Sequence, residues 1–147
     1  LGNLVPVRVL PGHNRSRWIA DTLLLEARAD ADLNLLARRA VQKRALAHFT
    51  ERINEFAPQV RVNAPSVGLS SARTRWGSCS EKTGVRLNWR LIHLPPHLGD
   101  YVVVHELAHL HEMNHSAKFW AVVESVCPNW KSARAELKAI APTLPLL

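Results

Sequence analysis

The sequence lacks the features of disulfide-stapled, membrane-spanning and fibrous proteins. Its 147 residues include only two cysteines, Cys79 and Cys127, which cannot form a disulfide framework in a chain of this length. Uninterrupted apolar runs reach only a few residues, so no helix can be apolar over the length needed to span a bilayer. The composition, with 47% hydrophobic and 21% charged residues, indicates a soluble globular protein instead.

Blocks of consecutive basic residues are also missing, although the formal net charge is +7. The positive excess lies in the first two thirds of the chain, and the part from His105 onward is formally neutral. A well-solvated positive surface is the simpler interpretation, and a surface that binds nucleic acid is the alternative. That alternative depends on basic residues of one predicted helix, namely Arg38, Arg39, Lys43, Arg44 and Arg52.

The chain has no internal repeat and no Pro/Gly/Ser-rich linker. A length near 150 residues predicts a single domain over residues 1–147, with N-terminal strands and the basic helix in about 1–58 and a motif-bearing core in about 66–141. Residues 1–10 contain neither a basic leader nor a long apolar stretch. We therefore expect a cytoplasmic protein with no membrane partner, and nothing in the sequence indicates its oligomeric state.

Hydrophobic periodicity predicts strands first and helices later, which is typical of the α+β class. The strands are expected at Val5–Leu10, Trp18–Ala27, Val60–Val62, Val67–Leu69, Ser70–Cys79 and Val85–Leu91. The helices are expected at Asp32–Phe56, His97–Met113, Ala117–Val126 and Trp130–Ile140. Pro58 is expected to end the first helix, and Ser116 fits the N-cap of the third.

The predicted helix from His97 contains the pattern His-Glu-x-x-His at residues 105–109. Residues four apart on a helix lie one above the other, so the imidazoles of His105 and His109 can point at one ion. Glu106 is rotated about 100° from His105, and its carboxylate can take the proton of a water on that ion. His115 follows the predicted helix end, where a turning chain can bring it back as a third ligand. Such a set of imidazoles suits zinc, because three protein ligands leave one position open for water.

Other residues compete for these roles. His111 points to a different side of the helix, and Glu112 lies about 10 Å along the axis from His105. Glu124 on the next helix could replace His115, and Cys79 could bind zinc as a thiolate, although a free cysteine is usually a small buried hydrophobe. The non-functional alternative is an amphipathic helix that carries surface histidines. It is weakened because Val102, Val103, Val104, Leu107 and Ala108 make the helix apolar around the histidines.

Five stretches of the second half of the chain form an ordered set of motifs. They are Arg75-Trp76-Gly77-Ser78-Cys79-Ser80, Leu87-Asn88-Trp89-Arg90-Leu91-Ile92, Tyr101 to Leu110, Asn114-His115-Ser116 and Phe119-Trp120. In this order they resemble the YgjP-like metallopeptidases. The resemblance covers about residues 73–130, and nothing comparable occurs in the first sixty residues.

This resemblance implies a small zincin-like domain, with a short, mostly antiparallel sheet packed on helices and the metal motif on a central helix. It implies zinc ligands at His105, His109 and His115, a general base at Glu106 and a peptide or protein substrate. It also implies kinship with the SprT-like and Wss1-like proteases that act on DNA-bound proteins. The competing hypothesis is a basic, zinc-containing protein that associates with nucleic acid, as a protease of DNA-bound proteins or a YbeY-like ribonuclease.

Two families with the same ligand spacing fit less well. Metzincin proteases have a glycine where this chain has Glu112 and a methionine turn downstream, whereas the only methionine here is Met113. YbeY-type endoribonucleases have no glutamate directly after the first histidine. Glu106 therefore favours hydrolysis of an amide over cleavage of RNA.

The residues that touch substrate are less clearly marked. Arg75, Trp76, Gly77 and Ser78 belong to a predicted strand that could border the cleft and pair with an extended peptide. The alternative is that Trp76 only anchors the core. The residue that assists the zinc as an electrophile could be Arg73, Arg75, Arg86 or Arg90, and the sequence selects none of them. The aromatic residues Trp89, Tyr101, Phe119, Trp120 and Trp130 are expected mainly to pack in the core.

Overall fold

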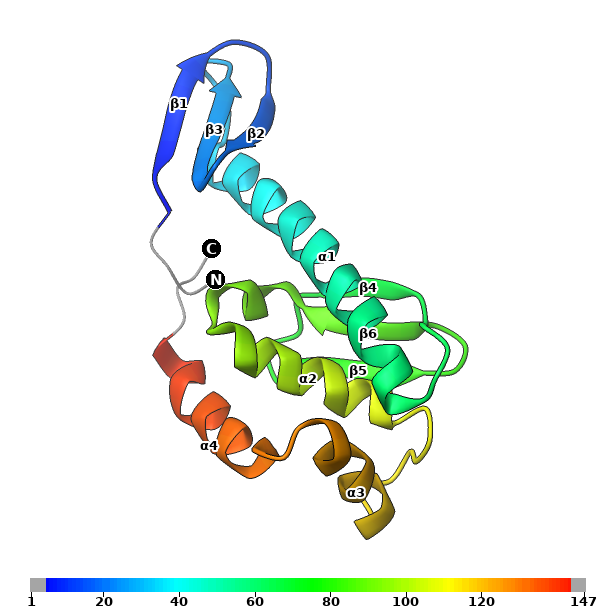
Figure 1. Cartoon of the computed structure of the whole chain (residues 1–147). Coiled ribbons are helices and arrows are strands. Elements are labelled where there is room, and N and C mark those ends of the chain that lie inside the picture. The colour runs from blue at the N-terminus through cyan, green and yellow to red at the C-terminus, as the bar shows by residue number, and fades with distance from the viewer. Residues whose placement is uncertain (1–4, 144–147) are drawn as a thin grey trace.

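Two small three-stranded sheets lie along one long helix, one near each of its ends (Figure 1). The computed structural model describes residues 5–143. The first sheet contains β1 (Val7–Pro11), β2 (Arg15–Ile19) and β3 (Thr22–Ala27) in the order β1-β3-β2. β1 runs parallel to β3, and β2 runs antiparallel to it. The single strand expected at Trp18–Ala27 is therefore wrong, because a turn at Ala20 with φ of 51° divides it into two strands.

Helix α1 (Leu33–Val60) is longer than the sequence predicts. The side chain of Asp32 caps it by accepting a hydrogen bond from the Leu35 N–H at 3.1 Å. Pro58 does not end the helix, since a proline in the last turn removes only one backbone hydrogen bond. The helix ends instead at Arg61, whose φ of 63° is left-handed. The strand predicted at Val60–Val62 is accordingly wrong.

The second sheet contains β4 (Val67–Ser70), β5 (Gly77–Ser80) and β6 (Gly84–Asn88) in the order β4-β6-β5. β4 is parallel to β6, and β5 is antiparallel to it, with Gly77 opposite Leu87. The strand predicted over Ser70–Cys79 is interrupted by a loop at residues 71–76. The strand predicted to reach Leu91 ends at Asn88, where a 3₁₀ helix begins (Trp89–His93).

The loop at residues 71–76 is fastened to the end of β6 by buried polar groups. The Asn88 side-chain amide donates to the carbonyl of Ala72 at 2.8 Å, and the Asn88 backbone N–H donates to the carbonyl of Trp76. The Trp89 indole N–H donates to the Ser71 hydroxyl at 3.1 Å. Asn88 is 4% exposed, so these bonds satisfy a polar group that would otherwise be costly to bury. They also fix where β5 starts.

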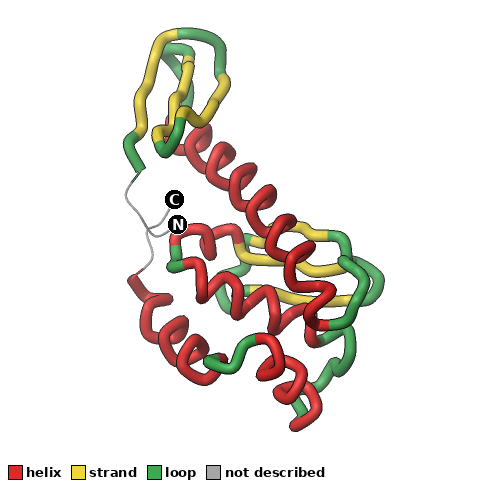
Figure 2. Tube along the Cα trace, viewed as in Figure 1, coloured by secondary structure: helices red, strands yellow, loops and turns green. Residues whose placement is uncertain are grey.

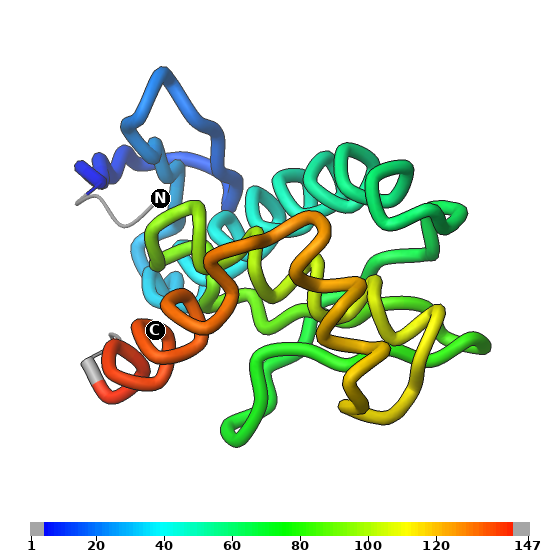
Figure 3. Tube along the Cα trace, turned by 60° about the horizontal axis from the view of Figure 1, so that its bottom comes forward, coloured from blue at the N-terminus to red at the C-terminus, as the bar shows by residue number. Residues whose placement is uncertain are grey.

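Helix α2 (Pro96–Ala108) lies among the other elements of the core and contacts α1, α3, α4, β5 and β6. α1 and α2 lie against the second sheet (Figure 2). Val85 and Leu87 of β6 are completely buried in the core that these elements share. An ion pair joins the two helices, with Arg52 Nε 2.8 Å from Asp100 Oδ1. The remaining helices are α3 (Ala117–Val126) and α4 (Trp130–Ile140), and the chain reverses direction between α2 and α3 (Figure 3).

The expected α+β class is confirmed. The sheet differs from the mostly antiparallel one that was expected, because each of the two sheets combines one parallel and one antiparallel pairing. Within residues 5–143, no helix has both the length and the apolar character that crossing a membrane requires.

Candidate metal centre

The last turn of α2 supplies the first part of the site. His105 and Glu106 lie in this turn, and His109 is the C-cap of the helix. The helix ends at Ala108, so its predicted extension to Met113 is wrong. After Ala108 the backbone tightens, with hydrogen bonds from Leu110 N–H to the Leu107 carbonyl and from His111 N–H to the Ala108 carbonyl. This tightening lets the chain turn away from the α2 axis.

His115 is carried back to α2 by the start of α3. Ser116 caps α3 by accepting from the Phe119 N–H at 3.3 Å, as the sequence predicts. The ring centroid of His115 then lies 5.2 Å from that of His105 and 4.8 Å from that of His109. One nitrogen from each imidazole lies within 4.8 Å of the others, and no second group of this kind occurs in the described part of the chain.

Hydrogen bonds engage the Nδ1 atoms of two of the imidazoles. His109 Nδ1 lies 3.1 Å from the carbonyl oxygen of Glu112, and His105 Nδ1 lies 3.1 Å from Glu106 Oε2. When both Nδ1 atoms donate, Nε2 of each ring is unprotonated and can bind a metal. Histidine ligands in proteins usually have such partners, which fix the tautomer and the ring orientation. The donor set therefore fits a metal ion that prefers nitrogen.

Aromatic rings enclose the imidazoles on the α3 side. Phe119 is completely buried and stacks on His109 with centroids 4.5 Å apart, while Trp120 stacks on His115 at 6.0 Å. Partial desolvation, followed by the charges of His105 and His109, lowers the pKa of His115. At neutral pH this favours the neutral imidazole, which is the form that binds a metal. The packed Phe119 is as expected, whereas Trp120 is only half-buried.

Glu106 is buried at 5% exposure between His105 and strand β5. A Cβ atom added to Gly77 would lie 2.9 Å from both Cγ and Oε2 of Glu106, closer than such atoms approach in proteins. Only glycine at residue 77 therefore lets β5 pass the carboxylate at this distance. The structure thus brings Gly77 of the predicted edge strand directly to the predicted base.

The competing ligands lie outside the group of three histidines. Glu124 is exposed on α3. Burial, followed by the charges of Glu106 and Glu81, raises the pKa of the Cys79 thiol to about 11, so the free thiol stays protonated at neutral pH. His111 Nε2 contacts the Val60 carbonyl at 2.6 Å, and Glu112 reaches the site only through its backbone carbonyl. His111 thus ties the end of α2 to the end of α1.

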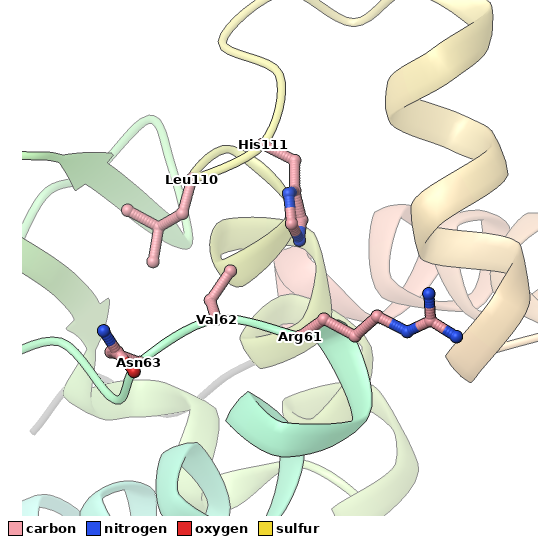
Figure 4. Close-up of a pocket in the computed structure, with 5 residues that line it drawn as sticks. All are labelled: Arg61, Val62, Asn63, Leu110 and His111. Carbon is pink, nitrogen blue, oxygen red and sulfur yellow. The ribbon is translucent and has the colours of Figure 1, made fainter.

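A shallow pocket of about 520 Å³ lies at this same junction. Arg61, Val62 and Asn63 line it from the end of α1, and Leu110 and His111 line it from the segment after α2 (Figure 4). None of the three clustered histidines is among these residues, so the pocket is separate from the candidate metal centre.

The four arginines that the sequence offers as the electrophilic residue lie in different parts of the fold. Arg86 projects from the sheet face opposite the buried Val85 and Leu87, beside Gly68. Arg90 lies over the Trp89 ring at 4.7 Å. Arg73 and Arg75 are exposed in the loop before β5.

A fifth arginine lies near the candidate metal centre, and the sequence did not indicate it. Arg134 of α4 lies over the Trp120 ring at 5.5 Å, and Trp120 in turn stacks on Trp130 at 4.1 Å. The spacing of Trp130 and Arg134 places them on one face of a helix, and this is a detectable signal. Their approach to Trp120 is a tertiary contact between α3 and α4, which no local pattern indicates.

The basic residues of α1 are partly used within the fold. Arg44 lies 4.1 Å from the Trp18 ring centroid and 3.7 Å from Asp21, and Arg52 pairs with Asp100. The supposed nucleic-acid surface therefore keeps only part of its positive charge free.

A zinc-protease motif at the end of a helix, with a third histidine delivered by the next helix, defines a metallopeptidase site. The comparisons agree, since the sequence profile described as "YgjP-like, metallopeptidase domain" matches residues 1–140, and the chain belongs to this family. A search of curated proteins finds no match.

Two solved structures share the fold. The metallopeptidase zymogen of Pyrococcus abyssi abylysin is 24% identical with a TM-score of 0.58, over 62% of this chain and 92% of that one. The metallopeptidase zymogen of Methanocaldococcus jannaschii jannalysin is also 24% identical with a TM-score of 0.54, over 65% of this chain and 97% of that one. At this identity the likeness supports the fold.

Proposed function

We propose that this metallopeptidase hydrolyses peptide bonds with a zinc ion held by His105, His109 and His115. The observation that carries the proposal is the approach of three imidazole nitrogens to within 4.8 Å of one another. Zinc bound at 2.0–2.1 Å places tetrahedral ligand nitrogens about 3.3 Å apart, so small side-chain movements suffice to close the set. A bound zinc ion supplies Lewis acidity toward the scissile carbonyl and lowers the pKa of a water toward about 7.

Glu106 is the general base in this proposal. Its carboxylate is buried beside His105, where it can accept a proton from the attacking water and pass it to the leaving amine nitrogen. Its contacts with His105 and Gly77 restrict the carboxylate to one small region. The chain therefore holds its base in place before substrate arrives.

Strand β5 is the candidate binding strand for the substrate backbone. It is an edge strand of its sheet, so one side of its backbone has no neighbouring strand within the described residues. An extended peptide can add to such an edge through main-chain hydrogen bonds. Arg75 and Trp76 lead into the strand, and Gly77 and Ser78 begin it beside Glu106. A peptide held there has its carbonyl groups close to the base.

Metal removal tests the proposal directly. We expect a zinc chelator to abolish hydrolysis of a peptide by the purified protein, and about one equivalent of zinc to restore it. Zinc at 100 times its Kd should also stabilise the fold by about 2.7 kcal/mol, measured by thermal unfolding. Magnesium at the same concentration is the control, because imidazole ligands do not suit it. Full activity in the zinc-free protein would refute the proposal.

A further inference from the structure

Two tryptophans extend the metal centre into a shelf between α3 and α4. Trp120 stacks on His115 at 6.0 Å with an interplanar angle of 27°, and Trp130 stacks on Trp120 at 4.1 Å and 17°. Both rings are half-buried, so each keeps an exposed part. We call these residues, together with Lys131 and Arg134, the tryptophan shelf.

Two cations lie on this shelf. The guanidinium carbon of Arg134 is 5.5 Å from the Trp120 ring, and Lys131 Nζ is 5.6 Å from the Trp130 ring. These distances are typical of cation–π contacts, which hold a long side chain against an aromatic face. The ring contact thereby reduces the entropy that Arg134 would lose on binding an anion.

No carboxylate within residues 5–143 forms an ion pair with either cation. Glu124, one turn after Trp120, stays beyond ion-pair distance of both. Glu136 of α4 is already engaged, with Oε2 2.8 Å from His97 Nε2. The shelf therefore presents two positive charges that the described fold does not neutralise.

Arg134 also lies near the metal centre. Its guanidinium carbon is 5.5 Å from the Trp120 ring, and the same ring stacks on His115 with centroids 6.0 Å apart. One indole therefore separates the cation from the nearest of the three histidines, and the cation can contact a molecule bound there.

We propose that the tryptophan shelf binds a carboxylate of the peptide substrate through Arg134, with Lys131 in support. This inference rests on the proposed peptide hydrolysis and names its substrate class. A guanidinium pairs with a carboxylate through two parallel hydrogen bonds, which gives orientation as well as attraction. Arg134 and His115 contact the same Trp120 ring, so about one indole width separates the bound carboxylate from the metal centre. An extended peptide advances about 3.3 Å per residue, which places the carboxylate about two residues from the scissile bond. The carboxylate comes from an Asp or Glu side chain or from the C-terminus of the peptide.

Cleavage of matched peptides tests this specificity. A peptide with one Glu near the cleavage point is compared with its Gln counterpart, each with a free or an amidated C-terminus. We expect Arg134→Gln to lower kcat/KM for the carboxylate-bearing peptide about five- to tenfold and to leave the neutral, amidated peptide unchanged. Arg134→Lys should retain part of the preference, and Lys138→Gln, on the same helix, is the control. The Glu/Gln and acid/amide comparisons distinguish the two sources of the carboxylate.

Binding provides a second measurement that does not need turnover. In zinc-loaded Glu106→Gln protein, quenching of tryptophan fluorescence should report tighter binding of the carboxylate-bearing peptide, and Arg134→Gln should remove the difference. The specificity proposal would be overturned if the carboxylate-bearing and the neutral peptide bound with equal affinity. It would also be overturned if Arg134→Gln cleaved each of these peptides as fast as wild type does. If zinc-loaded wild type cleaved none of the peptides, but the carboxylate-bearing peptide still bound more tightly than the neutral one, only the proposed hydrolysis would be overturned.

Discussion

Glu106→Gln is expected to lower kcat for peptide hydrolysis by about 10²- to 10⁴-fold, which is the usual contribution of a general base. The amide is nearly the same size as the carboxylate, so it fits between His105 and Gly77 without a new clash. It cannot accept a proton from water at neutral pH. All three imidazoles are retained, and the glutamine side-chain carbonyl can still accept the hydrogen bond from His105 Nδ1. The variant should therefore bind as much zinc as wild type, measured by metal analysis beside the kinetics.

Glu112→Gln is the matched control for this substitution. Glu112 lies in the same segment, but only its backbone carbonyl contacts the site, through His109. Its activity should equal that of wild type. If Glu106→Gln keeps wild-type kcat while binding zinc, Glu106 is not the base, and another group must accept the proton.

Gly77→Ala is expected to reduce kcat by about 10²-fold, the loss that a displacement of about 1 Å can cause at a reacting group. The added methyl would lie 2.9 Å from Cγ and Oε2 of Glu106, so either strand β5 or the buried carboxylate has to move. Zinc content should stay unchanged, because the histidines lie on other elements. Steady-state kinetics and metal analysis measure both quantities.

Gly68→Ala controls for the loss of a glycine in the same sheet. The new methyl would also meet an atom at 2.9 Å, but that atom is the end of the flexible Arg86 side chain, which can move aside. This variant should keep both activity and zinc. A Gly77→Ala protein as active as Gly68→Ala would show that the close approach of β5 does not position Glu106.

Local patterns account for the parts of the site that the sequence could predict. The spacing of His105 and His109 places them on one face of a helix, and Ser116 forms the N-cap that starts α3 directly after His115. Both features depend on residues within one or two helical turns. The structure accordingly brings together the three histidines that the sequence had indicated.

The errors occur where longer-range packing or a single backbone angle decides the outcome. Left-handed backbone at Ala20 and Arg61 creates a hairpin and a helix end at residues whose types do not suggest either. The end of α2 at Ala108 likewise has no glycine to mark it. The sequence places Gly77 in a strand but does not predict its approach to Glu106, because that approach is a tertiary contact between β5 and α2. The same is true of Arg134, which reaches the centre through Trp120.

Zinc analysis of His115→Ala protein tests the proposed metal centre most directly. His111→Ala is the control, because His111 contacts the Val60 carbonyl and lies outside the group of three imidazoles. After identical dialysis, wild type and His111→Ala should each retain about one zinc per chain, and His115→Ala should retain far less. Zinc retained by His115→Ala at the wild-type level would contradict this account, and Glu124 would then be the next ligand to test.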